Sequence, residues 1–254
     1  TGNKFEFRMV GSNDSVSSAN VVLNTIVAES FADACDELEK ADDVNGAIHD
    51  LIKRYFSDHQ RIIFNGNGYS DEWVKEAERR GLPNIKTMVD AIPAFITDKA
   101  VDMFHRFKVY DKNELESRVE VLYETYAKEM NIEARAMIDI ASKHIIPAVI
   151  KYITSLAHSI NEVNAVGGMD VSCQTELLKK CSDLLAQAKE ALKALETAQK
   201  KSGTLSEGKE QAEYFKDVVK EAMDQLRRPV DELEMLVDKE MWPMPSYGDL
   251  IFEV

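Results

Sequence analysis

The stretch LLKKCSDLLAQAKEALKAL, residues 177–195, carries apolar side chains at alternating three- and four-residue steps: Leu178, Cys181, Leu185, Ala188, Leu192 and Leu195. This spacing places them on one side of an α-helix and is typical of a coiled-coil-like seam. Such a seam is stable when other apolar side chains cover it. The stretch therefore predicts a helix over about residues 170–201 that packs against partner helices.

The sequence upstream predicts a second long helix. Apolar residues recur at helical spacing from Leu115 to Val163, and Asn113 with Glu116 has the spacing of a capping box at its start. At 1.5 Å per residue this helix would be roughly 75 Å long. A kink is expected at Pro147, because proline lacks the backbone donor of an ordinary helical residue.

The sequence downstream predicts a third helix. Thr204 and Glu207 have the spacing of a second capping box, and the apolar positions run from Phe215 to Val237. Pro229 is expected to bend this helix.

Short glycine-containing links join the three helices, and short links favour antiparallel neighbours. We therefore interpret residues 113–240 as an antiparallel helical bundle. The seam could also be a contact between subunits. Residues 241–254 contain two prolines that stop a helix and are predicted to form an extended tail.

Residues 1–112 have a different texture and predict a short strand followed by a compact packing of short helices. The first predicted helix is buried and ends near Lys40, and the others lie at about 47–59, 71–80, 85–95 and 97–107. The glycine-rich stretch NGNGYS, residues 65–70, lacks the GxxxxGK[ST] pattern and follows a helix. It is interpreted as a turn rather than a phosphate-binding loop.

Residues 3–9, NKFEFRM, alternate charged and apolar side chains. In a strand, successive side chains point to opposite faces, so Lys4, Glu6 and Arg8 would share one face. That face could be a solvated surface held by weak salt bridges. It could also bind an anionic substrate and a divalent cation, because a carboxylate suits Mg²⁺ or Mn²⁺ and flanking cations suit phosphate.

Composition narrows the possible partners. The chain of 254 residues has 45 acidic against 31 basic residues, a formal charge of −14, which opposes binding to nucleic acid or to an anionic membrane. Three scattered cysteines and no membrane-spanning or export pattern favour a reducing cytoplasm. The five histidines include no HExxH motif, so no metal site is predicted from them. The absence of an initiator Met before the first strand indicates a fragment or a processed product.

Several segments of the chain, taken together, resemble those of one enzyme family. NKFEFR followed by SANVVLNTIVAESF is similar to the Arg-x-Glu-x-Arg strand and following helix near the end of the glutamine synthetase catalytic domain. FNGNGYSDEWVKEAERRGLPN, NIEARAMIDIASKHIIPAVIKY and WPMPSYGDLIFEV resemble the C-terminal region of the type III enzymes. The resemblance covers essentially the whole chain.

This resemblance implies an ATP-dependent ligase that forms glutamine from glutamate and ammonia through γ-glutamyl phosphate. It implies that Glu6 is a metal ligand for Mg²⁺ or Mn²⁺ and that Arg8 holds the substrate carboxylate or the acyl phosphate. Lys4 stands where the common pattern has Arg, so it would bind ATP phosphate without a bidentate fork. The residues of the turn that follows depart from the family pattern, and no role is assigned to them.

The predicted fold is mainly α, with residues 1–112 as the end of the catalytic domain, then the bundle at 113–240 and the tail. The resemblance implies a cytoplasmic, ring-forming homo-oligomer, a dodecamer, that takes part in nitrogen assimilation. Most of the family's catalytic carboxylates and loops are not in this sequence, so the chain alone is predicted to be inactive. The alternative from another class is a stand-alone helical scaffold or protein-interaction module.

Overall fold

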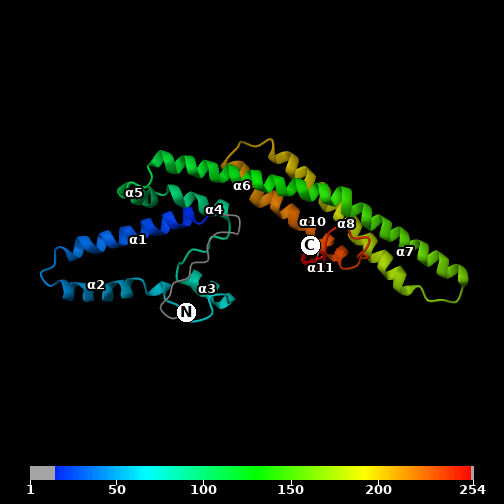
Figure 1. The fold of residues 1–254 in the computed structure, drawn as a ribbon, viewed down its shortest axis with the longest axis horizontal. Helices are drawn as coiled ribbons and strands as arrows, with labels where there is room; N and C mark the ends of the chain where they lie inside the picture. Colours follow the sequence, from blue (N-terminus) through cyan, green and yellow to red (C-terminus); the bar gives the residue numbers. More distant parts are fainter. Residues whose placement is uncertain (1–14, 253–254) are drawn as a thin grey trace. The chain divides into compact units, whose positions relative to one another are not determined.

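The computed structural model describes residues 15–252, and this part of the chain is all-α (Figure 1). The α-helices are α1 (Ser17–Leu38), α2 (Val44–Asp58), α3 (Asp71–Arg79), α4 (Met88–Ala91), α5 (Asp98–Arg106), α6 (Lys112–Ile140), α7 (Ile146–Val166), α8 (Ser172–Ser202), α9 (Lys209–Tyr214), α10 (Lys220–Glu234) and α11 (Tyr247–Phe252). Two 3₁₀-helices, η1 (Gln60–Ile62) and η2 (Ile92–Ile96), and two π-helices, η3 (Ala141–Ile145) and η4 (Phe215–Val219), complete the described elements.

The predicted fold class, mainly α with a short N-terminal strand, is wrong because it includes a strand. No strand occurs among residues 15–252, so the observed class is all-α. The stretch predicted as a strand, residues 3–9, lies outside the described residues. A lone strand leaves its backbone donors and acceptors unpaired, and the helices described here offer no sheet edge on which such a strand could pair.

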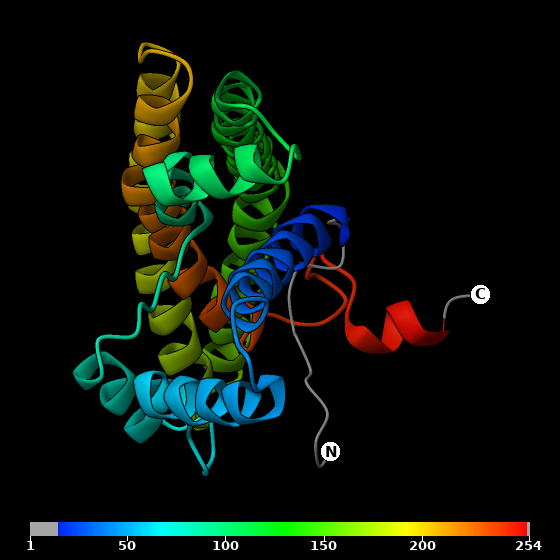
Figure 2. The same cartoon turned by 90° about the vertical axis from the view of Figure 1, so that its left-hand side faces the viewer.

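The chain divides into two units, Thr1–Val119 and Glu120–Val254, each with its own packing. In the second unit, α7, α8 and α10 run alongside one another as an antiparallel bundle, with α8 packed on both of the others (Figures 1 and 2). The seam positions Cys181, Ala188, Leu192 and Leu195 are fully buried there. The predicted intramolecular packing of the seam is therefore observed.

The core of the second unit runs along all of its long helices. Buried apolar residues come from the second half of α6, from α7, α8 and α10 and from both π-helices, and include Ala134, Val149, Leu226, Leu233 and Phe215. The periodic apolar pattern of the sequence is thus matched by a continuous buried interior.

Pro147 lies in the first turn of α7, two residues after the end of the π-helix η3, inside the long predicted helix. A π-turn adds a residue to the helical turn and so makes room where the proline ring would meet the preceding carbonyl. The chain remains helical across this position. Pro229, in contrast, lies buried inside α10 without a π-turn next to it.

Neither predicted capping box forms at the residues predicted for it. The first forms two residues earlier, where the Asp111 amide donates to Glu114 Oε2 and the Glu114 amide donates to Asp111 Oδ1, each at 2.8 Å. The second does not form: no helix begins at Thr204, and its hydroxyl donates to the Lys201 carbonyl. Helix α9 begins only after Gly208, whose φ of 90° marks a turn.

Among its described residues, the first unit buries fewer apolar side chains than the second. One cluster consists of Met103, Phe104 and Leu115, with partly buried side chains of α1 and η2 around it, and Leu51, Val89 and Ile92 are buried elsewhere in the unit. Helix α1 was predicted to be buried, and this is wrong, because Thr25 is its one buried residue. Phe31 of this helix is 67% exposed. The helix itself was predicted correctly. The described residues do not cover the side of it that carries Phe31.

Ion pairs hold α1 to its neighbours in the first unit. Arg54 of α2 donates to both carboxylate oxygens of Glu37, at 3.0 and 2.6 Å. Arg106 of α5 donates to Asp33 at 2.7 Å. These contacts are exposed, so each contributes little to stability.

The end of the chain differs from the predicted extended tail. After α10 the described chain turns several times, and residues 247–252 form the short helix α11. The Asp249 carboxylate accepts bonds from the Ser246 amide and hydroxyl, each at 2.7 Å, which fixes the start of this helix.

None of the described helices combines the length and the apolar composition that crossing a membrane requires.

Candidate functional site

The residues implied by the resemblance, Lys4, Glu6 and Arg8, lie outside the described residues. Their roles in binding ATP, a divalent cation and the substrate carboxylate stay predictions. Among residues 15–252, no group of three or more His, Cys, Asp or Glu side chains is placed to hold a metal ion.

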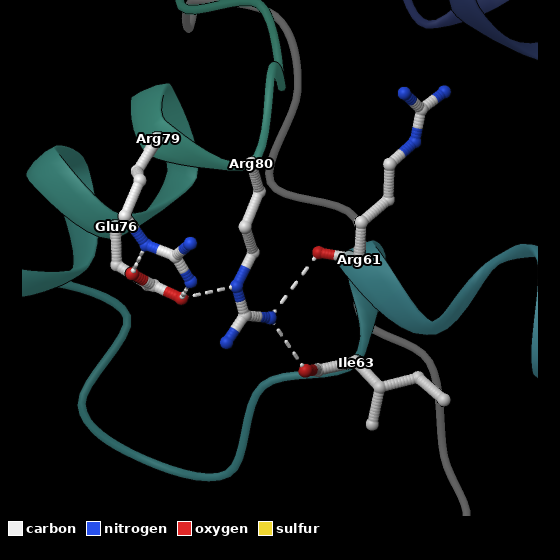
Figure 3. Close-up of polar contacts among 5 residues, drawn as sticks. All are labelled: Arg61, Ile63, Glu76, Arg79 and Arg80. Atoms are coloured by element: carbon white, nitrogen blue, oxygen red, sulfur yellow. Dashed lines mark hydrogen bonds and ion pairs between the residues drawn. The ribbon is translucent and has the colours of Figure 1, made fainter.

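The most organised polar cluster of the first unit joins α3 to the chain that precedes it (Figure 3). Arg79 makes a two-pronged contact with Glu76, with both bonds at 2.7 Å. Arg80 donates from Nε to the same carboxylate at 2.6 Å. Its Nη1 donates to the carbonyls of Arg61 and Ile63, at 3.2 and 2.9 Å. Arg80 thus connects the end of α3 to the end of η1.

The two guanidinium groups hold the carboxyl of Glu76 in its charged form. Hydrogen bonds from Arg79 and then Arg80 lower the pKa of Glu76 to about 2. The pKa of Arg79 is raised by the same contact with Glu76. Because both guanidinium groups bind this carboxylate and Arg80 also binds two backbone carbonyls, the cluster is suited to fixing the backbone rather than to proton transfer.

Two aromatic rings pack next to this cluster. Phe64 stacks on Trp73 with ring centroids 4.0 Å apart and an interplanar angle of 22°. The Arg80 guanidinium lies 5.5 Å from the centroid of the Trp73 ring. Cation–π and ring-stacking contacts of this kind hold the loop from Phe64 to Ser70 against α3.

At Gly66 the backbone passes close to the ring of Phe64, which leaves no space for a side chain while the ring keeps this position. A Cβ atom at Gly66 would lie 2.6 Å from Phe64 Cζ, which is closer than two carbons can approach. A Cβ at Gly68, by contrast, would meet nothing within 4 Å. The predicted turn at residues 65–70 is observed, closed by the Ser70 amide donating to the Asn67 carbonyl at 3.2 Å. The predicted helix cap is also confirmed, because Ser70 Oγ accepts from the Trp73 amide.

Sequence reasoning missed this cluster. Neither Arg80 nor Glu76 was singled out, because a Glu followed three and four residues later by Arg is a common exposed helix pattern. The aromatic residues that flank the glycines, Phe64 and Trp73, were the available signal.

Apolar surfaces are the other prominent feature of the first unit. A hollow of about 320 Å³ lies between α1, η2 and α5, and Val22, Ile26, Phe95 and Met103 contribute to its lining. Two charged groups, Glu29 and Lys99, also line it. Helix α2 and η1 expose a second apolar strip, formed by Ile48, Ile52, Tyr55, Phe56, Ile62 and Ile63. Apolar area of this extent is typical of a surface that another protein segment covers.

Comparisons with known proteins relate this chain to one family. Residues 47–164 match the model of the glutamine synthetase C-terminal domain. All of the chain aligns with a glutamine synthetase of Butyrivibrio fibrisolvens at 33% identity, over 37% of that protein. The type-3 glutamine synthetase of Dictyostelium discoideum is 32% identical over 99% of the chain and 35% of its own length. A glutamine synthetase of Bacteroides fragilis is 30% identical over 99% of the chain and 36% of its own length.

The chain therefore spans about a third of the length of the curated relatives it matches. These matches confirm the resemblance to the C-terminal region of type III glutamine synthetases that the sequence motifs indicate.

Proposed function

This chain belongs to the glutamine synthetase family, and we propose that it forms the C-terminal part of an enzyme that uses ATP to join ammonia to glutamate. The observation that carries the proposal is that the relationship to glutamine synthetases extends over 99–100% of the chain, rather than over one motif. In the proposed reaction, the side-chain carboxylate of glutamate attacks the γ-phosphorus of ATP, and ADP leaves. Ammonia then displaces phosphate from the γ-glutamyl phosphate.

The residues proposed for this chemistry are Lys4, Glu6 and Arg8. Glu6 would bind Mg²⁺ or Mn²⁺, since a carboxylate is a suitable hard oxygen ligand for either cation. A divalent cation supplies charge stabilisation to the phosphoryl group in transfer. Arg8 would hold the substrate carboxylate or the acyl phosphate through its planar fork, and Lys4 would contact ATP phosphate as a point charge.

The first unit is proposed to complete the catalytic domain. Its apolar hollow and the apolar strip of α2 and η1 support this, because a domain that folds alone covers most such surface. In the complete enzyme, we propose that preceding parts of the polypeptide or a neighbouring subunit pack there. The complete enzyme is proposed to be a cytoplasmic homo-oligomeric ring, a dodecamer.

The bundle is proposed to brace this assembly rather than to take part in catalysis. Its self-contained core supports that role, because removing it would not open the interior of the first unit. Deletion of residues 120–240 from the complete enzyme keeps Leu115 in the core cluster of the first unit, and should reduce the size of the particle measured by light scattering. An unchanged particle with full activity would contradict the bracing role.

The experiment that tests the proposed function measures glutamine formation by the complete enzyme and by its Glu6→Ala variant. The complete enzyme should form glutamine from glutamate, ammonia and ATP in the presence of Mg²⁺. Loss of a metal ligand removes several kcal/mol of transition-state stabilisation, so Glu6→Ala should lower the rate by at least about a hundredfold with assembly intact.

The matched control is Glu129→Ala, which removes an exposed carboxylate of α6 and should leave the rate unchanged. Absence of glutamine formation by the complete enzyme would contradict the function, and a fully active Glu6→Ala enzyme would contradict only the ligand role. The chain of 254 residues alone should form no glutamine.

A further inference from the structure

A polar pocket of about 370 Å³ lies in the second unit, where α6, the end of α8 and the start of the next helical segment meet. Three carboxamide side chains line it, those of Asn131, Gln199 and Gln211. All of its lining residues lie in Glu120–Val254, so the pocket is complete within this unit. It contains none of the residues to which the proposed reaction assigns a role.

Hydrogen bonds fix the carboxamides in place. Gln199 Nε2 donates to Asn131 Oδ1 at 2.9 Å, which links α8 to α6. Gln211 Nε2 donates to the Ser202 carbonyl at 3.0 Å, and the Ser202 hydroxyl donates to the Gln199 carbonyl at 2.7 Å. Ser202 is buried, so the end of α8 is held firmly. The pocket is therefore preformed, as small-molecule sites usually are.

The Asn131–Gln199 bond leaves one donor group and one acceptor group for a bound molecule. It uses the oxygen of Asn131 and the nitrogen of Gln199, so the Asn131 amide nitrogen and the Gln199 amide oxygen keep hydrogen-bonding capacity. A primary carboxamide offers the complementary acceptor and donor. A carboxylate accepts only, and would leave the Gln199 oxygen without a donor.

The charges of the pocket balance. Lys128 contacts Glu124 at 2.9 Å, and its pKa is raised by this hydrogen bond and, to a smaller extent, by the charge of Glu207. Lys200 and Glu207 also line the pocket, and neither forms a salt bridge within the part of the chain that the structure describes. One cation and one anion are thus available to a ligand. This favours a zwitterion over a phosphate, a nucleotide or a metal cation, each of which would require an excess of one charge.

The remaining lining is apolar. It comes from Ala127 and Phe215, which are 2% and 1% exposed and belong to the bundle core. We propose that this pocket binds a free α-amino acid with a carboxamide side chain. Its carboxamide bonds to Asn131 and Gln199, its ammonium group pairs with Glu207, and its carboxylate pairs with Lys200.

Isothermal titration calorimetry of the 254-residue chain tests this proposal directly, because the chain can bind without catalysing any reaction. The probe is L-glutamine, for which saturable binding at millimolar concentration is expected. N-acetyl-L-glutamine lacks the ammonium group and L-norvaline lacks the carboxamide. Each should bind at least about tenfold more weakly, as expected for losing a charged or a paired hydrogen-bonding group. Inorganic phosphate should give no saturable heat.

Variants separate this pocket from binding elsewhere. Gln199→Leu should weaken L-glutamine binding by about tenfold or more, since it removes one amide partner and disconnects the other. Lys200→Gln should weaken it several-fold and, because this side chain is exposed, should leave folding intact. The matched control is Gln225→Leu, the same change at an exposed glutamine of α10, which should bind as the unaltered chain does. Circular dichroism checks the fold of each variant.

The proposal is overturned by absence of saturable L-glutamine binding, or by Lys200→Gln and Gln199→Leu chains that bind as tightly as the unaltered one. Phosphate binding tighter than that of L-glutamine would overturn the zwitterion assignment as well.

Discussion

The two units of this chain differ in how much of their apolar surface is packed into a continuous core. In Glu120–Val254 the apolar side chains meet one another along α8 and its neighbours, and the core cluster reaches every long helix. In the described part of Thr1–Val119 fewer apolar side chains are buried, and large apolar side chains of α1 and α2 are exposed. A helix with one apolar seam can be satisfied by two partners, whereas a helix that is apolar around much of its surface requires covering on several sides.

This difference is consistent with the proposed roles of the units. The bundle contains all the partners that its seam requires. The first unit presents surfaces that the proposed catalytic domain would cover. Four measurements can break or sharpen this contrast.

The largest effect is expected from one phenylalanine in each unit. Phe215→Ala removes a ring that is 1% exposed in the bundle core, and should lower the free energy of unfolding by about 3–5 kcal/mol. Phe31→Ala removes a ring of α1 that is 67% exposed, and should change it by less than about 0.5 kcal/mol. Urea unfolding of the chain followed by circular dichroism measures both. Equal losses for the two variants would contradict the contrast.

A smaller effect is expected in the loop that precedes α3. Gly66→Ala should displace the Phe64 ring from Trp73 and cost about 1 kcal/mol, because the new methyl group occupies the position of the ring. The tryptophan signal in near-ultraviolet circular dichroism would report the loss of stacking. Gly68→Ala, the matched control, should keep that signal. If both variants keep it, the close packing of this loop is not present in solution.

The smallest effect is expected in the stability of the chain at acidic pH. The folded-state pKa of Glu76 is about 2, below its ordinary value of 4.5, so its contribution to stability is fully present above about pH 4.5. The contribution is lost as the pH falls from 4.5 toward 2, because protonation breaks the contacts with Arg79 and Arg80. Carboxyl carbon shifts measured by NMR should give a low pKa for Glu76 that rises toward its ordinary value in Arg79→Gln. A value near 4.5 in the unaltered chain would show that the contact is weak.

Sequence patterns predicted the positions of the helices well, but they predicted the burial and the capping of those helices poorly. The helix at 170–201 was predicted within two residues of α8, because its period and its stop at Ser202-Gly203 are local signals. The burial of α1 could not be predicted, since burial depends on partners that periodicity does not reveal. The capping box was misplaced at Asn113 because Asp111 and Glu114 have the same spacing and the pattern does not choose between them.

The functional sites show the same limit of prediction from sequence. The resemblance named Lys4, Glu6 and Arg8, which lie outside the described residues, so the structure leaves those roles as predictions. The pocket at Asn131 and Gln199 was not predicted, because its residues are 68 positions apart and carry no motif.

The central claim is that apolar surface of the first unit is covered in the complete enzyme. The most direct test is the rate at which a thiol reagent labels Ile52→Cys, in a background where Cys35 and Cys173 are replaced by serine. Cys181 is buried, and burial raises the pKa of its thiol, so it should stay unreactive. Ile150→Cys, on the exposed side of α7, is the control position in the second unit, because both isoleucines are about half exposed, at 50% and 49%.

In the 254-residue chain, both introduced thiols should react rapidly. In the complete enzyme, the account predicts that labelling of Ile52→Cys slows by at least about tenfold relative to Ile150→Cys, because a packed surface excludes the reagent. Equal labelling of Ile52→Cys in the chain and in the complete enzyme would contradict the claim.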